Sequence, residues 1–308
     1  MNFPRKIIIG TRSSDLALWQ SNFIKSRIAA IAPDIYIELK HIKTKGDKFI
    51  NTPLAKIGGK GLFTKELENA LLSGEINVAV HSLKDLETAV PEGLAIAAVT
   101  ERHAREDVLI ARTRGTTIDD IPSGGTVGTG STRRRAQLLA LRPDLTTEDL
   151  RGNVPTRIRK FQESKWDAVI LARAGVERLG LEQHISSVIP RHVMIPAVGQ
   201  GALGVEINSD NEALRRLLEK IDHRPTRICT TAERTFLAAL GGGCQYPIAA
   251  TADLDGESIR IEGMVASVDG SEQYRDAIDG PADDPESLGR RLARTLLDRG
   301  ADKILGNL

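Results

Sequence analysis

The chain has 308 residues, of which 41% are hydrophobic and 27% are charged. This length suggests two or three domains, and the composition is that of an ordinary globular protein rather than a disordered or fibrous one. The formal net charge is +1, so the chain as a whole has no field that would draw it to nucleic acid or to an anionic membrane.

The two cysteines, Cys229 and Cys244, are too few for a disulfide framework. The apolar run Ile7–Ile9 is too short for the hydrophobic region of a secretory signal. No stretch approaches the roughly 20 apolar residues of a membrane-spanning helix. We therefore expect a cytoplasmic protein with reduced thiols and no membrane segment.

The first hundred residues alternate apolar runs with helical patterns. Strands are predicted at 6–10, 36–44 and 76–82, and helices at 15–31 and 61–74. Either Ser14 or Asp15 would cap the first of these helices.

The same rhythm resumes near residue 100 and changes after residue 227. Strands are predicted at 107–111, 125–129 and 167–175, with helices at 131–141 and 154–164. The run Gly199–Gly201 marks a predicted crossover between lobes. Beyond residue 227, alternating apolar and polar residues with Asp-Gly turns predict an antiparallel meander over 251–278, followed by a helix over 285–305.

Strands that alternate with helices predict an α/β architecture with mainly parallel sheets. We expect two α/β lobes and a smaller α+β domain at the C-terminal end. The predicted boundaries are residues 1–99 and 200–220 for domain 1, residues 100–199 for domain 2, and residues 221–308 for domain 3.

Metal and nucleotide motifs are missing from the sequence. The six histidines show no HExxH spacing, and there is no CxxC pair. Neither a phosphate-binding GxxxxGK[ST] loop nor a GxSxG nucleophile motif occurs. We predict no metal site.

Arginines recur directly after predicted strands. They follow four separate strand ends, as Arg12, as Arg133–Arg135, as Arg151 and Arg157, and as Arg173 and Arg178. The carboxyl ends of strands in open α/β sheets form the ligand crevice, and guanidinium groups pair bidentately with carboxylates and phosphates. One such arginine is more often solvated or ion-paired, but the recurrence predicts a site for several anionic groups.

Three consecutive arginines cannot share one pocket, because neighbouring helical positions point about 100° apart. We predict that Arg135 faces away from the site that Arg133 and Arg134 serve.

Lys84 and Asp85 follow the strand predicted at 76–82. They are either a solvated loop pair or part of the crevice, where nearby cations would keep the acid ionised so that it could stabilise a cationic intermediate or relay a proton. The Gly- and Lys-rich segment 43–63 is either a mobile surface loop or a lid that carries Lys56 and Lys60 over an anionic ligand.

Three glycines, Gly241–Gly243, directly precede Cys244. A lone cysteine is usually a small buried apolar residue, and this interpretation suits Cys229. A backbone without side chains before a thiol instead suits a cysteine that must carry or contact a bulky group.

Seven segments together resemble the porphobilinogen deaminase (hydroxymethylbilane synthase) family. They run in order and with compatible spacing from Gly10 to Pro247, as LAKIGGKGLFTKELE, VHSLKD, VGTGSTRR, RGNVPTR, LARAGVERLGL, PAVGQGALGVE and ERTFLAALGGGCQYP. The last 60 or so residues carry little of this signature. The resemblance implies a monomer with two lobes like type II periplasmic binding proteins and a third domain that holds the cofactor.

The resemblance also implies a transferase of tetrapyrrole biosynthesis. Four porphobilinogen molecules would condense head to tail into hydroxymethylbilane, each losing ammonia to give an azafulvene-like electrophile. Cys244 would hold a dipyrromethane primer through a thioether. Asp85 would contact pyrrole N–H groups, stabilise positive charge and handle protons.

The acetate and propionate groups of the pyrroles would account for the arginines. Matching the family's carboxylate binders are Arg12, Ser14, Lys84, Arg133, Arg134, Arg151, Arg157 and Arg178, with Thr129, Ser131 and Asn153 as weaker candidates. The chain departs from the family pattern at Asp15, Glu87, Gly130 and Tyr246. These departures put local cofactor contacts in question, not the reaction.

Two other classes of function remain as alternatives. A non-catalytic anion-binding protein built from two such lobes would have no use for the glycine-framed Cys244. A nucleic-acid binder is disfavoured by the net charge of +1 and by an aromatic content of only 4%.

Overall fold

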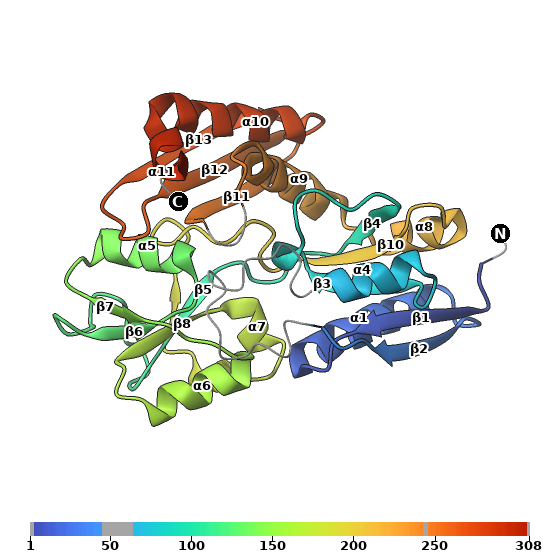
Figure 1. The fold of residues 1–308 in the computed structure, drawn as a ribbon, viewed down its shortest axis with the longest axis horizontal. Coiled ribbons are helices and arrows are strands. Elements are labelled where there is room, and N and C mark those ends of the chain that lie inside the picture. The colour runs from blue at the N-terminus through green and yellow to red at the C-terminus, as the bar shows by residue number, and fades with distance from the viewer. Residues whose placement is uncertain (1–2, 45–63, 243–245, 307–308) are drawn as a thin grey trace. The chain divides into compact units, whose positions relative to one another are not determined.

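The computed structural model describes residues 3–44, 64–242 and 246–306. Three sheets organise them: two of five strands and one of three (Figure 1). This confirms the predicted α/β class, with two sheet-rich lobes and a small C-terminal α+β part. The predicted lid residues Lys56 and Lys60 and the predicted attachment site Cys244 lie outside the described residues.

The first sheet has the strand order β2-β1-β3-β10-β4. Its strands are β1 (Lys6–Thr11), β2 (Tyr36–His41), β3 (Val78–Ser82), β4 (Leu94–Val99) and β10 (Leu203–Asn208). Strand β10 runs antiparallel to both of its neighbours, and the other pairings are parallel. Four of the five strands therefore run in one direction, as predicted.

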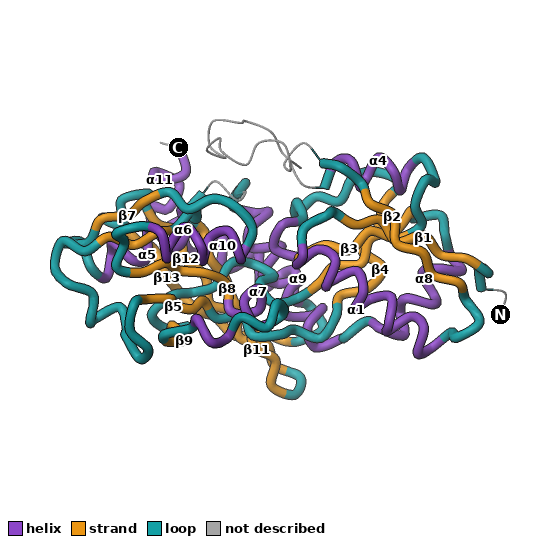
Figure 2. Tube along the Cα trace, turned by 90° about the horizontal axis from the view of Figure 1, so that it is seen from below, coloured by secondary structure: helices purple, strands orange, loops and turns teal. Residues whose placement is uncertain are grey.

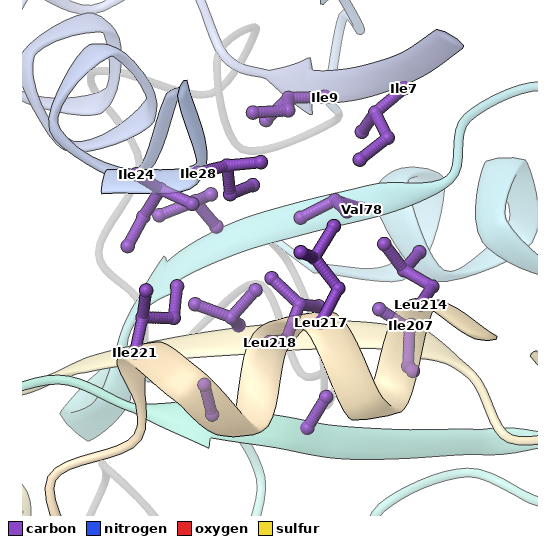
Figure 3. Packing of buried hydrophobic residues seen from close by; sticks show 14 of the residues in the cluster. Ile7, Ile9, Ile24, Ile28, Val78, Ile207, Leu214, Leu217, Leu218 and Ile221 are labelled. Carbon is purple, nitrogen blue, oxygen red and sulfur yellow. The ribbon is translucent and has the colours of Figure 1, made fainter. Parts of the chain in front are cut away.

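Alternating apolar side chains give this sheet two hydrophobic faces. Helices α1 (Asp15–Ile31) and α8 (Glu212–Leu218) cover one face, and α4 (Lys65–Leu72) covers the other (Figure 2). Figure 3 shows the first face, where Ile24 and Ile28 of α1 and Leu217 of α8 pack around Val78.

The second sheet repeats this pattern in the order β7-β6-β8-β5-β9. Its strands are β5 (Asp107–Ala111), β6 (Thr126–Gly128), β7 (Thr146–Glu148), β8 (Ala168–Ala172) and β9 (Ser187–Ile189). Strand β5 is antiparallel to β8 and β9. Helix α5 (Thr132–Leu141) packs on one face, and α6 (Val154–Glu163) and α7 (Arg173–Glu177) pack on the other.

The third sheet is the predicted antiparallel meander. Strands β11 (Ile248–Asp255), β12 (Ser258–Ala266) and β13 (Gln273–Pro281) pair in sequence order. Helices α9 (Arg224–Ala239) and α10 (Pro285–Leu296) pack their apolar residues against it.

The predicted helix over 285–305 is interrupted. It continues beyond α10 through a wide turn, Leu297–Ala301, to a short helix α11 (Asp302–Gly306). The break lies at Gly300, whose φ of 114° is not helical, and an added Cβ there would lie 2.8 Å from the Tyr274 hydroxyl oxygen.

Contacts divide the described residues into two compact units. One comprises residues 3–44, 64–103 and 202–227, and the other comprises residues 104–242 and 246–306 apart from 202–227. The predicted three-domain boundaries stay a prediction.

Candidate functional site

In the first unit, the ends of β1 and β3 place four predicted site residues at one edge of the sheet. The two strands are adjacent and parallel, with Gly10 opposite Ala79, so the segments that follow them leave the same edge. Arg12 and Ser14 follow β1, whereas Lys84 and Asp85 follow β3.

Ser14 is the N-cap of α1. Its hydroxyl oxygen accepts a hydrogen bond from the Ala17 amide at 3.4 Å, which resolves the choice between Ser14 and Asp15. Asp15 lies in the first turn, where a negative charge is favourable beside the helix N-terminus.

Asp85 lies in a single 3₁₀ turn, Leu83–Asp85, directly after β3. The flanking Leu83 and Leu86 are buried, and the Leu83 amide donates to the Ala202 carbonyl at 3.0 Å. Lys84 is half-buried, whereas Asp85 is exposed. The turn is therefore held by its leucines, and the Asp85 carboxylate is left to face outward.

A buried pair that sequence reasoning missed lies behind this turn. The Nε2 atom of His81 on β3 is 3.1 Å from the Oε2 atom of Glu206 on β10, and both side chains are buried. Both residues belong to apolar strand patterns, which show no sign that they would be partners.

In the second unit, the segments after β6, β7 and β8 also leave one edge, because β6 pairs in parallel with both neighbours. Thr129 is buried, and its hydroxyl oxygen accepts the Ser131 amide at 3.3 Å. Ser131 is the N-cap of α5 and accepts the Arg134 amide at 3.4 Å. Both residues therefore shape the start of α5.

Arg133 and Arg134 are buried and share one carboxylate. Their Nη2 atoms each lie 2.8 Å from an oxygen of Asp107, the first residue of β5. The Nη1 atom of Arg133 donates to the Ile195 carbonyl at 2.7 Å, and that of Arg134 donates to the Ile170 carbonyl at 3.1 Å.

Arg135 turns away from its two neighbours, as predicted. It pairs instead with Asp149 at 3.1 Å, and both of these side chains are partly exposed.

Arg151, Asn153 and Arg157 surround the start of α6. Asn153 is the N-cap, and its side-chain oxygen accepts the Thr156 amide at 2.9 Å. The Nε atom of Arg157 donates to the Gly152 carbonyl at 2.7 Å. The Nε atom of Arg151 is buried and has no hydrogen-bond partner among the described residues.

Gly130, one of the departures from the family pattern, lies against this segment. An added Cβ would lie 2.6 Å from the Leu150 carbonyl oxygen, so a side chain would require the backbone to shift. The local backbone is thus matched to glycine.

Arg178 follows α7, and its Nη2 atom donates to the Gly201 carbonyl at 2.7 Å. Burial lowers the pKa of Arg178 to about 10, because the charged form is disfavoured away from water. A carboxylate bound to this guanidinium would counteract that shift.

Cys229 on α9 is buried and belongs to the core of the C-terminal part, in agreement with its interpretation as a small apolar residue. Among the described residues, no group of three or more histidine, cysteine or acidic side chains could hold a metal ion. No helix in the described part of the chain is both long and apolar enough to cross a bilayer.

Two family models match the chain. Residues 7–216 match "Porphobilinogen deaminase, dipyromethane cofactor binding domain", and residues 227–298 match "Porphobilinogen deaminase, C-terminal domain". A solved structure of the Bordetella pertussis BvgS VFT2 domain is also similar, with a TM-score of 0.43 and 13% identity over 70% of this chain and 86% of that one.

Curated relatives match along almost the whole length. A porphobilinogen deaminase of Syntrophomonas wolfei is 50% identical over 98% of both chains. One from Pelotomaculum thermopropionicum is 48% identical over 98% of this chain and 96% of its own. Since both the family models and these relatives span the two units, the chain belongs to the porphobilinogen deaminase family, the hydroxymethylbilane synthases, which are transferases of tetrapyrrole biosynthesis.

Proposed function

We propose that this chain condenses four porphobilinogen molecules head to tail into hydroxymethylbilane and releases ammonia, with Asp85 at the reaction centre and the dipyrromethane attached to Cys244. The observation that carries this proposal is the family match over residues 7–216, which includes the dipyrromethane-binding domain. The geometry of the first sheet supports the same proposal. The exposed Asp85 follows β3, and the cations Arg12 and Lys84 leave the same edge of the sheet.

The second unit offers donors that fit a group with several carboxylates. The Nε atoms of Arg133, Arg134 and Arg151 are all buried and lack a hydrogen-bond partner among the described residues. A buried donor without a partner costs about 1–3 kcal/mol. Acetate and propionate side chains are ligands of the right charge and geometry to relieve that cost.

The dipyrromethane, when bound, supplies a pyrrole carbon as the nucleophile. Arg133, Arg134 and Arg151 would bind its carboxylates, and Thr129, Ser131, Asn153, Arg157 and Arg178 lie in the segments that leave the same edge. Arg12, Ser14 and Lys84 would bind carboxylates at the edge of the first sheet. Lys56 and Lys60 would contribute cations from a lid over the substrate.

Asp85 would act on the substrate itself. Its carboxylate would accept hydrogen bonds from pyrrole N–H groups and offset the positive charge that develops at the pyrrole nitrogen as ammonia leaves. It would also take up and return the proton that the condensation displaces. The arginines serve the peripheral carboxylates, so an acid is needed where the bonds change.

We further propose a cytoplasmic enzyme that uses no metal and binds no nucleic acid. The net charge of +1 supports the last point.

Intact mass under denaturing conditions tests the attachment. The purified protein should be heavier than its sequence by two pyrrole units, and Cys244→Ser should lose this increment. Cys229→Ala is the matched control and should keep it, because Cys229 is a buried core residue. An active protein with an unmodified Cys244 would contradict the proposal.

A further inference from the structure

Asp107 is a fully buried carboxylate at an edge where anions would bind. It begins β5 and lies opposite Ala172, the last residue of β8. Because β5 is antiparallel to β8, its first residue lies at the edge where β8 ends. A negative charge at such an edge repels an anionic ligand and competes with it for the same cations. We therefore ask what Asp107 contributes at this edge.

Three side chains converge on the two oxygens of Asp107. Oδ2 accepts from Arg133 at 2.8 Å, and Oδ1 accepts from Arg134 at 2.8 Å and from the Gln200 amide at 3.0 Å. Burial by itself would raise the pKa of Asp107, but the two guanidinium groups hold it well below its usual value. The cluster therefore contains two positive charges and one negative charge.

Both guanidinium groups are also held from their far sides, by the carbonyls of Ile195 and Ile170. Gln137 adds a second support, since its side chain bonds both the amide and the carbonyl of Ile195. Each arginine is thus fixed at Nη1 and Nη2, and the buried Nε remains without a hydrogen-bond partner among the described residues.

We propose that Asp107 is a positioning residue that orients Arg133 and Arg134 and cancels one of their two charges, so that the pair presents one net positive charge to one ligand carboxylate. This inference rests on the proposed carboxylate-binding role of the two arginines. With Asp107 in place, the two guanidinium groups can be buried side by side before any ligand arrives. Without it, the pair would carry two uncompensated charges and would need an additional anion.

The first experiment measures thermal unfolding of Asp107→Asn in a Cys244→Ser background, with sodium acetate added at constant ionic strength. Asparagine keeps the shape and removes the charge. We expect a lower midpoint without acetate, and an acetate-dependent rise at least twice that of the Cys244→Ser parent. Asp149→Asn is the matched control, because it removes the partly exposed partner of Arg135, and its acetate response should equal the parent's.

The second experiment measures cofactor loading by intact mass in the protein with Cys244. Asp107→Asn should carry at least tenfold less of the two-pyrrole increment than the wild type, while Asp149→Asn should carry a normal amount. An acetate response equal to the parent's, together with normal loading, would overturn the proposal. The acetate experiment does not depend on attachment at Cys244. A wild type without the two-pyrrole increment would contradict the proposed function, but the acetate response would still test the role of Asp107.

If Asp107→Asn shows no cooperative unfolding transition, a double substitution still tests the proposal. Asp107→Asn combined with Arg134→Gln restores a net charge of +1, and we expect it to recover a cooperative transition with the parent's acetate response. If the double variant also fails to fold, or if its acetate response equals that of a foldable Asp107→Asn, the charge-cancelling role is wrong.

Discussion

Asp85 and Asp107 are both carboxylates at sheet edges, but their surroundings are opposite. Asp85 is exposed in a turn held by its neighbouring leucines, whereas Asp107 is fully buried between two guanidinium groups. The first arrangement leaves a carboxylate available for chemistry, and the second commits one to structure.

Substitution of Asp85 should affect turnover and not folding. Asp85→Asn removes the charge and the proton-transfer capacity, so the single-turnover rate with porphobilinogen should fall by the ~10²–10⁴ typical of a lost acid–base group. Asp85→Glu keeps the charge and should retain more activity. Rates should be compared on protein shown by mass to hold the cofactor, and near-normal turnover of Asp85→Asn would place the proton chemistry elsewhere.

Substitution by leucine should affect cofactor assembly and elongation strongly at Arg151 and only mildly at Arg135. Arg151→Leu should weaken cofactor assembly or elongation about ten- to hundredfold, as expected for a lost charge-assisted hydrogen bond of roughly 1.5–3 kcal/mol. Arg135→Leu should be mild, because exposed pairs such as Arg135–Asp149 contribute only about 0.2–1 kcal/mol. Product formation and cofactor mass measure both effects, and equal sensitivity would show that Arg135 also serves the ligand.

Arg133→Leu combines two effects, since it also removes a partner of the buried Asp107. Breaking a buried pair costs about 3–5 kcal/mol. The unfolding free energy of Arg133→Leu therefore has to be measured together with its activity, so that lost stability is not mistaken for lost ligand binding.

The Asp107 cluster should also give the stability a pH dependence. Burial would raise the pKa of Asp107, but Arg133 and Arg134 lower it below its usual 3.8. A carboxyl group whose pKa is lowered by folding stabilises the fold at pH values above its pKa in the unfolded state. This contribution is lost as the pH falls towards its pKa in the folded state. The difference in unfolding free energy between wild type and Asp107→Asn should thus be constant from about pH 7 to 5 and shrink below about pH 4.

Urea denaturation of both proteins across this range makes the measurement. A difference that stays constant down to about pH 3, well inside the predicted window, would mean that the charge of Asp107 does not stabilise the fold.

At the level of elements, α5 is held from two directions. Its first turn carries the arginines that reach Asp107, and its middle contacts the turn between β12 and β13. At that turn Gly270 has a φ of 74°, and an added Cβ would lie 2.4 Å from the Ala136 carbonyl oxygen and 2.6 Å from the Ala140 amide nitrogen. Only a glycine allows this approach of backbone to backbone.

Two glycine substitutions separate backbone strain from this close approach. Gly256 also has a positive φ, 58°, but an added Cβ there meets nothing within 4 Å. Gly256→Ala should cost about 1–2 kcal/mol for the left-handed conformation, and Gly270→Ala should cost a further ~1–3 kcal/mol for overpacking. Urea denaturation measures both losses of unfolding free energy. Equal losses would show that the turn at Gly270 can shift away from α5 without cost.

At the level of the whole molecule, the exposed large apolar side chains belong to separate segments. Among the described residues they are Trp19, Tyr36, Leu72, Val90, Leu141 and Val188. No two of them are neighbours in the sequence, and exposed apolar side chains that occur singly are normal on the surface of a monomer. We expect the mass of one chain by light scattering after size exclusion, and a dimer mass that persists on dilution would contradict this expectation.

Much of the fold follows from local patterns in the sequence. The alternation of strands and helices, a cap at Ser14 or Asp15 and the antiparallel meander all depend on residues within a few positions of each other. The outward direction of Arg135 follows from the helical period alone. The break at Gly300 was missed, because a single glycine within an amphipathic pattern is compatible with a continuous helix. The strand predicted over 167–175 ends at Ala172, and helix α7 begins at Arg173. Strands β4, β7, β9 and β10 and helices α8 and α9 were not predicted.

The partners of the site residues required the tertiary structure. The sequence determined the family motifs, the recurrence of arginines after strands and the types of the elements. The pairing of Asp107 with Arg133 and Arg134 joins residues 26 and 27 positions apart, and that of His81 with Glu206 joins residues 125 positions apart. Periodicity reports which face a side chain occupies, but the residue opposite it depends on strand order and direction, which long-range packing decides.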